Sequence, residues 1–259
     1  MRRSRLPIVI TAAVMAFFYL PILILVANSF NASRFGAGWK GFTLGWYARL
    51  LHEPEIWAAA RNSLLIAAGA TLLSVVLGTA AAFALHRYGR SRLQRFHYVL
   101  VYMPLVVPEI LMGISLLMAF SATGVQLGLG TIFLAHVTFC VSFVAMTVLA
   151  RLQDFDDTVV EAARDLGAGP VLTFRRVILP MIAPGILAGA LLAFTLSIDD
   201  FVITFFVAGP GSTTLPIRIY SMIKFGSPPL INALSTILLV VTLTAVILSQ
   251  RISSPRRGA

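Results

Sequence analysis

The sequence predicts an all-α membrane protein with six transmembrane helices. Mean hydropathy is +0.90, and 58% of residues are hydrophobic while 12% are charged; in soluble domains about a quarter are charged. Six apolar stretches are long enough to cross about 30 Å of hydrocarbon. Their expected bounds are 8–27, 63–85, 98–120, 131–150, 183–207 and 231–250. A length of 259 residues suits one membrane domain, 1–259.

The first stretch follows Arg2, Arg3 and Arg5, as the apolar core of a secretory signal peptide would. At about twenty residues it is longer than such a core, and no small-residue cleavage site follows it. We therefore expect an uncleaved first span. The long loop after it, 28–62, carries aromatic residues typical of a membrane surface. They are Trp39, Trp46, Tyr47 and Trp57.

The distribution of basic residues predicts the orientation, because cytoplasmic flanks are enriched in Lys and Arg. Fourteen lie on one side: Arg2, Arg3, Arg5, Arg87, Arg90, Arg92, Arg95, Arg151, Arg164, Arg175, Arg176, Arg251, Arg256 and Arg257. Six lie on the other: Arg34, Lys40, Arg49, Arg61, Arg218 and Lys224. Both termini are thus expected in the cytoplasm. The net charge of +10 reflects this topology and contact with anionic lipid, and indicates no nucleic-acid partner.

One polar segment, 154–180, separates the fourth and fifth spans. Thr158 and Glu161 have the spacing of a capping box at a helix start. Gly167 stands where a left-handed C-cap is wanted, and Gly169 with Pro170 restarts a second helix. Two helices this short are marginal in water. The segment is therefore expected to dock on a partner surface.

This segment resembles the cytoplasmic docking signature of ABC importer permeases. The signature is Glu-Ala-Ala, a glycine four residues later, and an Ile-x-Leu-Pro element after nine more, with Val177 here at the usual Ile position. The resemblance implies a type I ABC importer permease fold whose Glu-Ala-Ala coupling helix pair docks on a cytoplasmic ATPase. The expected coupling residues are Glu161, Ala162, Ala163, Gly167, Phe174, Leu179 and Pro180.

The chain lacks the residues that an ATPase or a metalloenzyme needs. A phosphate-binding loop ends in Gly-Lys-Ser/Thr, and neither Lys40 nor Lys224 has that context. The four histidines show no metal-ligand spacing. We therefore expect no catalytic residue, metal site or cofactor in this chain; ATP and Mg²⁺ would be bound by a partner ATPase.

Several residues within the spans are given structural roles. Cys140 is expected to be a small core residue. His136 is expected to hydrogen-bond between helices rather than bind a metal. Four glycines would let helices approach closely; they are Gly69, Gly78, Gly185 and Gly189.

Three acidic residues lie within predicted spans, namely Glu109, Asp199 and Asp200. No Lys or Arg in those spans can pair with them, and intramembrane carboxylates usually face a transport pathway. At 1.5 Å per residue Glu109 lies about 16 Å along its span and Asp199 about 22 Å along its own. Asp199 and Asp200 would diverge by about 100° on one helix. The acids indicate a cationic cargo; the alternative is hydrogen bonding to neighbouring helices or to a partner permease.

Further strings resemble the C-chain type of permease in spermidine/putrescine (polyamine) ABC importers. They occupy residues 28–35, 41–43, 46–47, 135–140, 194–200, 215–222 and 232–238. The resemblance implies a bacterial inner-membrane complex with a second, homologous permease subunit, an ATPase dimer and a periplasmic polyamine-binding protein. Glu109 departs from the family, where an aspartate is expected.

Two other functions fit parts of the sequence. One is an ABC importer permease for another cargo, such as iron(III) or an anion, and the three acids argue against an anion. The other is a carrier driven by an ion gradient, for which inverted repeats with broken helices would be typical. No such repeat is visible in the sequence, and the docking signature favours an ATP-driven importer.

Overall fold

The computed structural model describes residues 6–34, 38–87, 92–153, 156, 158–226 and 228–253, without the side chains of 92, 228, 245, 246 and 248–253. The described chain is helical apart from its loops and an isolated antiparallel bridge between Asn31 and Phe42. Of the residues named above, those outside the described residues are Arg2, Arg3, Arg5, Arg90, Arg256 and Arg257.

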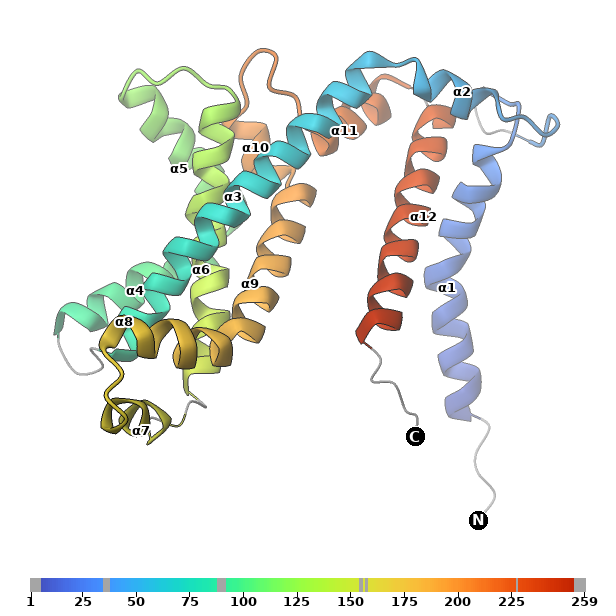
Figure 1. Ribbon diagram of the computed structural model, residues 1–259. Coiled ribbons are helices and arrows are strands. Elements are labelled where there is room, and N and C mark those ends of the chain that lie inside the picture. The colour runs from blue at the N-terminus through green and yellow to red at the C-terminus, as the bar shows by residue number, and fades with distance from the viewer. Residues whose placement is uncertain are drawn as a thin grey trace. The chain divides into compact units, whose positions relative to one another are not determined.

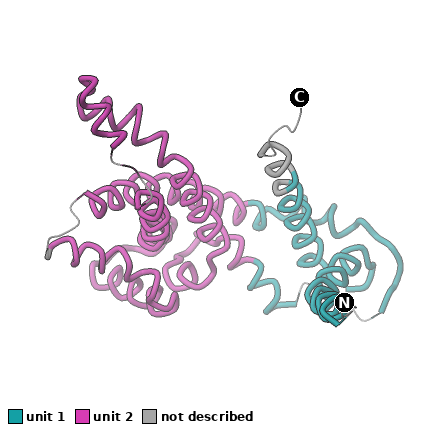
Figure 2. The backbone as a smooth tube through the Cα atoms, turned by 90° about the horizontal axis from the view of Figure 1, so that it is seen from below, with its two compact units in different colours: residues 1–57, 219–259 teal, residues 58–218 magenta. Residues whose placement is uncertain are grey.

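The chain forms two compact units, 1–57 with 219–259 and 58–218 (Figure 2). The expected single membrane domain stays a prediction. Unit 1 pairs α1 (Leu6–Ser29) with α12 (Pro228–Ser253), and α2 (Gly45–Leu51) packs against α12. The pair is antiparallel, so α1 begins and α12 ends at the same end (Figure 1). Nearly every apolar side chain of α1 is exposed, as expected of a helix facing lipid or another membrane subunit.

Asn31 organises the loop after α1. Its side-chain amide donates to the Gly38 carbonyl over 2.9 Å, and its Oδ1 accepts from the amides of Ser33 at 3.1 Å and Lys40 at 2.9 Å. The indole of Trp46 donates to the Asn31 carbonyl over 2.9 Å. Trp46 is therefore tied to this loop, whereas Trp39 and Trp57 are exposed as the predicted aromatic belt requires.

Unit 2 is a helical bundle in which α6 is central. Its elements are most of α3 (Pro54–Arg87), α4 (Arg92–Val106), α5 (Glu109–Ala122), α6 (Leu129–Gln153), α7 (Thr158–Asp165), α8 (Pro170–Thr173), the π-helix η1 (Phe174–Ile178), α9 (Leu179–Asp199), α10 (Val202–Val207) and the start of α11 (Leu215–Phe225). Buried side chains of α6 make up much of the core, and α6 packs against α4, α9 and α10.

Glycines let two helices approach α6 closely. A Cβ added at Gly78 of α3 would lie 2.8 Å from the Cβ of Val144, and one at Gly189 of α9 would lie 3.2 Å from the Val144 Cα. At Gly185 the added atom would lie 2.9 Å from the Cβ of Arg151. The predicted role of these glycines is confirmed, and so is that of Cys140, which is fully buried in this core.

Among the described residues, four helical segments are long and apolar enough to cross a membrane: α1, α3, α6 and the continuous segment Pro170–Asp199. The expected third span, 98–120, is instead two helices, α4 and α5, bent by 112° at the break before Glu109. The expected fifth span, 183–207, ends as a helix at Asp199. Both expected spans are therefore interrupted, and their bounds and the count of six stay predictions.

Candidate functional site

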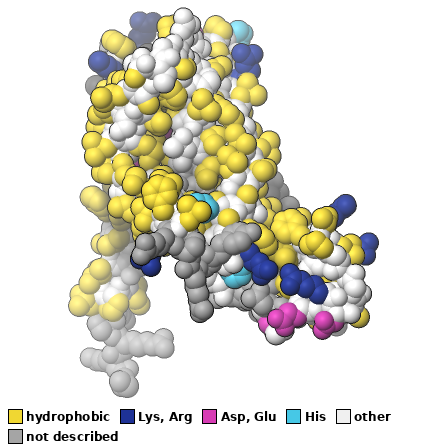
Figure 3. Space-filling view, turned by 90° about the vertical axis from the view of Figure 1, so that its left-hand side faces the viewer, with side chains coloured by type: hydrophobic (Ala, Val, Ile, Leu, Met, Phe, Trp, Pro, Cys, Tyr) yellow, Lys and Arg dark blue, Asp and Glu magenta, His cyan; other side chains and the backbone are white. Residues whose placement is uncertain are grey.

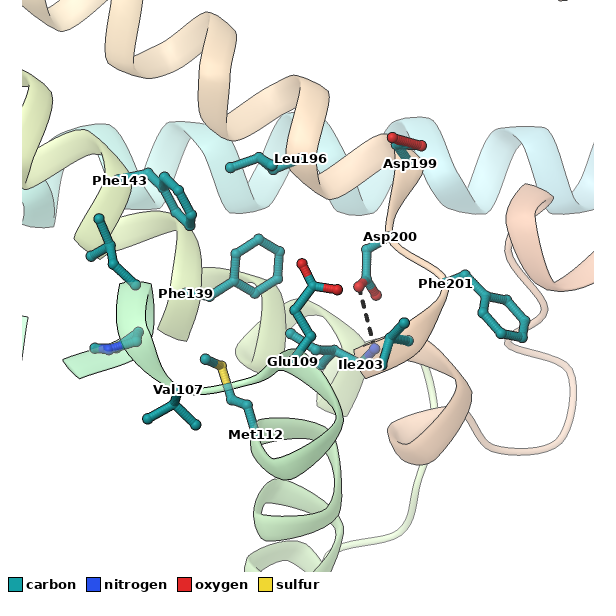
Figure 4. Close-up of a pocket in the computed structure, with 13 residues that line it drawn as sticks. Val107, Glu109, Met112, Phe139, Phe143, Leu196, Asp199, Asp200, Phe201 and Ile203 are labelled. Carbon is teal, nitrogen blue, oxygen red and sulfur yellow. Dashed lines mark hydrogen bonds between the residues drawn. The ribbon is translucent and has the colours of Figure 1, made fainter. Parts of the chain in front are cut away.

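The three intramembrane acids predicted from the sequence line one pocket. Its volume is about 270 Å³, and it lies where the α4–α5 and α9–α10 breaks meet α6. The lining residues are Pro104, Leu105, Val107, Glu109, Met112, Phe139, Phe143, Leu196, Asp199, Asp200, Phe201, Val202 and Ile203. Glu109 points toward Asp200 and Phe139, and Asp199 projects from the end of α9 (Figure 4).

Helix breaks, rather than helix faces, bring the acids together. Pro108 has an extended backbone with ψ of 133°, so α4 cannot continue and Glu109 begins α5. A carboxylate in the first turn is favoured by the helix dipole. Asp200 is likewise extended, with ψ of 123°, after α9 ends. Irregular backbone at membrane depth is tolerated where it lines a cavity, and both breaks line this one.

Asp200 holds the second break in place. Its Oδ1 accepts from the Ile203 amide at 3.2 Å, and its Oδ2 accepts from the Thr204 amide at 2.8 Å and the Thr204 hydroxyl at 2.6 Å. These bonds satisfy amides at the start of α10 that have no partner within the helix. For Asp200 the structure shows the alternative that the sequence left open, hydrogen bonding to neighbouring helices, through Thr204 and His136.

His136 of α6 joins the same network. Its Nδ1 lies 2.7 Å from the Ser197 hydroxyl, and its Nε2 lies 2.9 Å from the Thr204 hydroxyl and 3.3 Å from Asp200 Oδ2. The ring is 1% exposed. His136 is therefore the interhelical hydrogen-bonding residue that was predicted, and it links α6 to both sides of the α9–α10 break.

Glu109 and Asp199 differ from Asp200 in having open carboxylates. Both residues are exposed, and within the described chain no hydrogen bond or ion pair involves either side chain. The two acids are thus available for a ligand, whereas Asp200 serves the fold. The expected divergence of Asp199 from Asp200 by one helical step was wrong, because the helix ends between them.

Three aromatic side chains of the pocket were not predicted. Phe139 and Phe143 lie one turn apart on α6, and Phe201 follows Asp200 directly. The faces of such rings attract cations. The spacing of Phe139 and Phe143 is visible in the sequence. A pair of aromatic residues on one helix face is equally typical of a buried core, so the sequence did not identify them as pocket residues.

The coupling segment forms the predicted glycine cap. Gly167 has φ of 82°; its amide donates to the Arg164 carbonyl over 2.8 Å, and the Ala168 amide donates to the Ala163 carbonyl over 3.0 Å. This pair of bonds is the Schellman arrangement that ends a helix. Pro170 begins the next helix after Gly169, also as predicted.

Two details of this segment differ from expectation. The start of α7 is capped by Asp156, whose Oδ1 accepts from the Thr158 amide over 3.0 Å, rather than by a Thr158–Glu161 box. That hydrogen bond lowers the pKa of the Asp156 carboxyl. The second helix is not short, because α8 runs through η1 into α9 without a break, with Leu179 and Pro180 inside the helical run.

The expected coupling residues lie on an accessible surface. None of the α7 residues is buried, and Glu161 and Ala162 are exposed. Phe174 is partly covered because its ring makes an edge contact with Phe83 at 5.8 Å between centroids. An exposed helix of eight residues needs a partner to be stable. Among the described residues, no group of three or more His, Cys, Asp or Glu side chains could hold a metal ion.

Comparison with known proteins places these features among transport proteins. Residues 74–258 match the family model for the binding-protein-dependent transport system inner membrane component. The chain is 45% identical, over 93% of its length and 91% of the relative, to the spermidine/putrescine transport system permease protein PotC of Escherichia coli (strain K12). It is 44% identical, over 92% of its length and 86% of the relative, to the putrescine transport system permease protein PotI of the same strain.

Solved structures with the same fold are also ABC transporters. One is a bacterial ABC transporter involved in the import of the acidic polysaccharide alginate, with a TM-score of 0.74 at 15% identity over 98% of this chain and 99% of that chain. Another is the MetNI methionine ABC transporter, with a TM-score of 0.63 at 20% identity over 77% of this chain and 96% of that chain. At such identities the likeness concerns the fold alone.

Proposed function

Because this chain belongs to the family of binding-protein-dependent transport system inner membrane components, we propose that it is the polyamine permease of an ATP-driven importer. The cargo would be spermidine, putrescine or both, the substrates named for the relatives PotC and PotI. The observation that carries the proposal is the acidic, aromatic pocket at the two helix breaks.

The chemistry of this pocket suits a polyamine. Glu109 and Asp199 offer carboxylates that are not engaged within the described chain, and separated ammonium groups need separated anionic contacts. Phe139, Phe143 and Phe201 line the pocket; aromatic rings attract ammonium groups and give the methylene chain apolar surface. Removing an ammonium group from water is costly unless such contacts replace the water. Asp200 would not bind the cargo; it would fix the start of α10, which forms part of the pocket wall.

The remaining parts of the proposal concern the assembly. A second, homologous permease would complete the pathway, and a periplasmic polyamine-binding protein would deliver cargo. An ATPase dimer would bind ATP and Mg²⁺ and dock on the exposed surface of α7, including Glu161 and Ala163. The exposure of α7 supports this docking. Both termini would lie in the cytoplasm of a bacterium, with the chain in its inner membrane.

Charge-neutralising variants test the cargo role. Glu109→Gln and Asp199→Asn should each lower uptake of labelled spermidine by about ten- to a hundredfold, since a hydrogen bond to a charged group contributes about 1.5–3 kcal/mol. The yield of the assembled complex should change little, because neither side chain forms a hydrogen bond or ion pair within the described chain. Uptake into cells or proteoliposomes is measured beside the yield of complex after affinity purification.

Charge-retaining variants provide the control. Glu109→Asp and Asp199→Glu keep the carboxylates and should keep most of the uptake. Full uptake in both neutralised variants, with normal complex yield, would show that the pocket does not carry the cation. Equal loss in the neutralised and the charge-retaining variants would point to a packing role instead.

A further inference from the structure

A second pocket of unit 2 lies at the end where α7 packs and is basic. Its volume is about 190 Å³, and it is lined by the last turns of α3 and α6, by α7 and by η1. Its described lining includes Arg87, Arg164 and His86 but no acidic residue. Both arginines are exposed, and neither forms an ion pair within the described chain. Glu161 and Asp165 of α7 do not line the pocket, so the described lining presents positive charge to an anion.

An apolar groove continues from this pocket along α3. Its volume is about 570 Å³, and it runs between α3 and the η1–α9 segment. Phe83 lines both cavities, so its ring, in contact with Phe174, forms the boundary between them. The groove is lined by Val75, Val76, Thr79, Ala80, Phe83, Ala84, Phe174, Leu179 and Ile186.

A basic pocket followed by an apolar groove matches the anionic headgroup and the acyl chain of a phospholipid. Arg87 ends a 34-residue helix whose preceding turns are apolar, which is where a headgroup meets a transmembrane helix. Figure 3 shows acidic side chains and several basic ones at the lower right of the view, further basic side chains at the top, and many hydrophobic side chains between them. Basic pockets between transmembrane helices bind anionic headgroups, and an acyl chain needs an apolar groove beside them. A small soluble anion has no apolar chain that could fill the groove.

We propose that the pocket and the groove together bind one anionic phospholipid, with its phosphate between Arg87 and Arg164 and an acyl chain along α3 past Phe83. The lipid would come from the leaflet at the α7 end, which the predicted orientation makes the cytoplasmic one. This site is separate from the acidic pocket and does not depend on the identity of the cargo.

The proposed lipid has a consequence for α7. Arg164 and Val160 belong to α7, whereas Arg87 and Phe83 belong to α3 and Leu152 to α6. A bound phosphate would therefore tie α7 to the base of the bundle by charge-assisted contacts. Anionic lipid should then support the position of α7 as well as the stability of the chain in the membrane.

The test uses the purified importer complex that contains this chain, delipidated in neutral detergent. Phosphatidylglycerol and phosphatidylcholine with matched acyl chains are titrated, and bound lipid is counted by native mass spectrometry. Arg87→Gln and Arg164→Gln should each weaken phosphatidylglycerol binding about fivefold, and the double variant about thirtyfold, as expected for basic residues at a membrane surface. Phosphatidylcholine binding should be weak and unchanged.

Two exposed arginines of η1 that do not line the pocket give a charge-matched control. Arg175→Gln combined with Arg176→Gln removes the same charge and should leave phosphatidylglycerol binding intact. Equal weakening by both double variants would overturn the proposal in favour of unspecific attraction. If the pocket variant does not assemble, equal binding of the two lipids by the unmodified complex would overturn it, and selective binding of phosphatidylglycerol would support it.

Two further experiments distinguish a bound lipid from a soluble anion and from a helix of the second permease. Inorganic phosphate and glycerol 3-phosphate should not displace bound phosphatidylglycerol, and displacement at millimolar concentration would identify a soluble-anion site instead. Ala80→Trp fills the groove and should weaken lipid binding while the second permease still co-purifies. Loss of the second permease with unchanged lipid binding would mean that a helix of that subunit occupies the groove.

Discussion

Removal of the Asp200 side chain should lower the free energy of unfolding, because this carboxylate holds the start of α10 and not the cargo. In Asp200→Ala the amides of Ile203 and Thr204 lose their acceptor, which is comparable to the loss of a helix cap at about 0.5–2 kcal/mol. The Thr204 hydroxyl and His136 also lose a partner. Polar contacts inside membrane proteins average about 0.6 kcal/mol and reach about 1.7. Together the losses amount to roughly 2–5 kcal/mol.

The neighbouring acid is the matched control. Asp199→Ala removes the same group one residue earlier, where the side chain is exposed and forms no hydrogen bond within the described chain. It should change the free energy of unfolding by less than about 0.5 kcal/mol. The assay is equilibrium unfolding of the purified chain in mixed micelles titrated with SDS. Equal stability of the two variants would refute the assignment of Asp200 to the fold and of Asp199 to the pocket.

Three further predictions concern the rest of the chain. Gly167→Val should impair ATPase co-purification and uptake while the chain still inserts, because φ of 82° strains a branched residue; Gly169→Ala, at a negative φ with open space around it, should be tolerated. Gly78→Val should destabilise the bundle by about 1–3 kcal/mol, since the added Cβ would lie 2.8 Å from α6, and SDS titration measures the loss. In a cysteine-free background, Arg164→Cys should be labelled from the cytoplasmic side and Lys224→Cys from outside; external labelling at Arg164 in intact spheroplasts would invert the topology.

Hydropathy and short motifs in the sequence were enough to predict the helical spans, two features of the coupling segment and two of the pocket carboxylates. The apolar runs predicted the helical spans, because a membrane helix must satisfy its own backbone and needs a length set by the bilayer. The Gly167 cap and the Pro170 restart were also predicted, since each depends on the backbone chemistry of one residue. The carboxylates Glu109 and Asp199 stood out because charge is rare in hydrocarbon.

The tertiary structure decided which of those acids are available and what surrounds them. Pro104 and Pro108 mark a weak point before Glu109 in the sequence, but not a bend of 112°, because proline is tolerated inside membrane helices when neighbours satisfy the freed groups. No proline or glycine marks the break at Asp200. It was the packing of α6 against α9 and α10 that set His136 beside Asp200 and left Glu109 and Asp199 open. The continuity of α8 with α9 and the cavities on either side of Phe83 likewise depend on contacts between distant segments, which no local pattern of residues encodes.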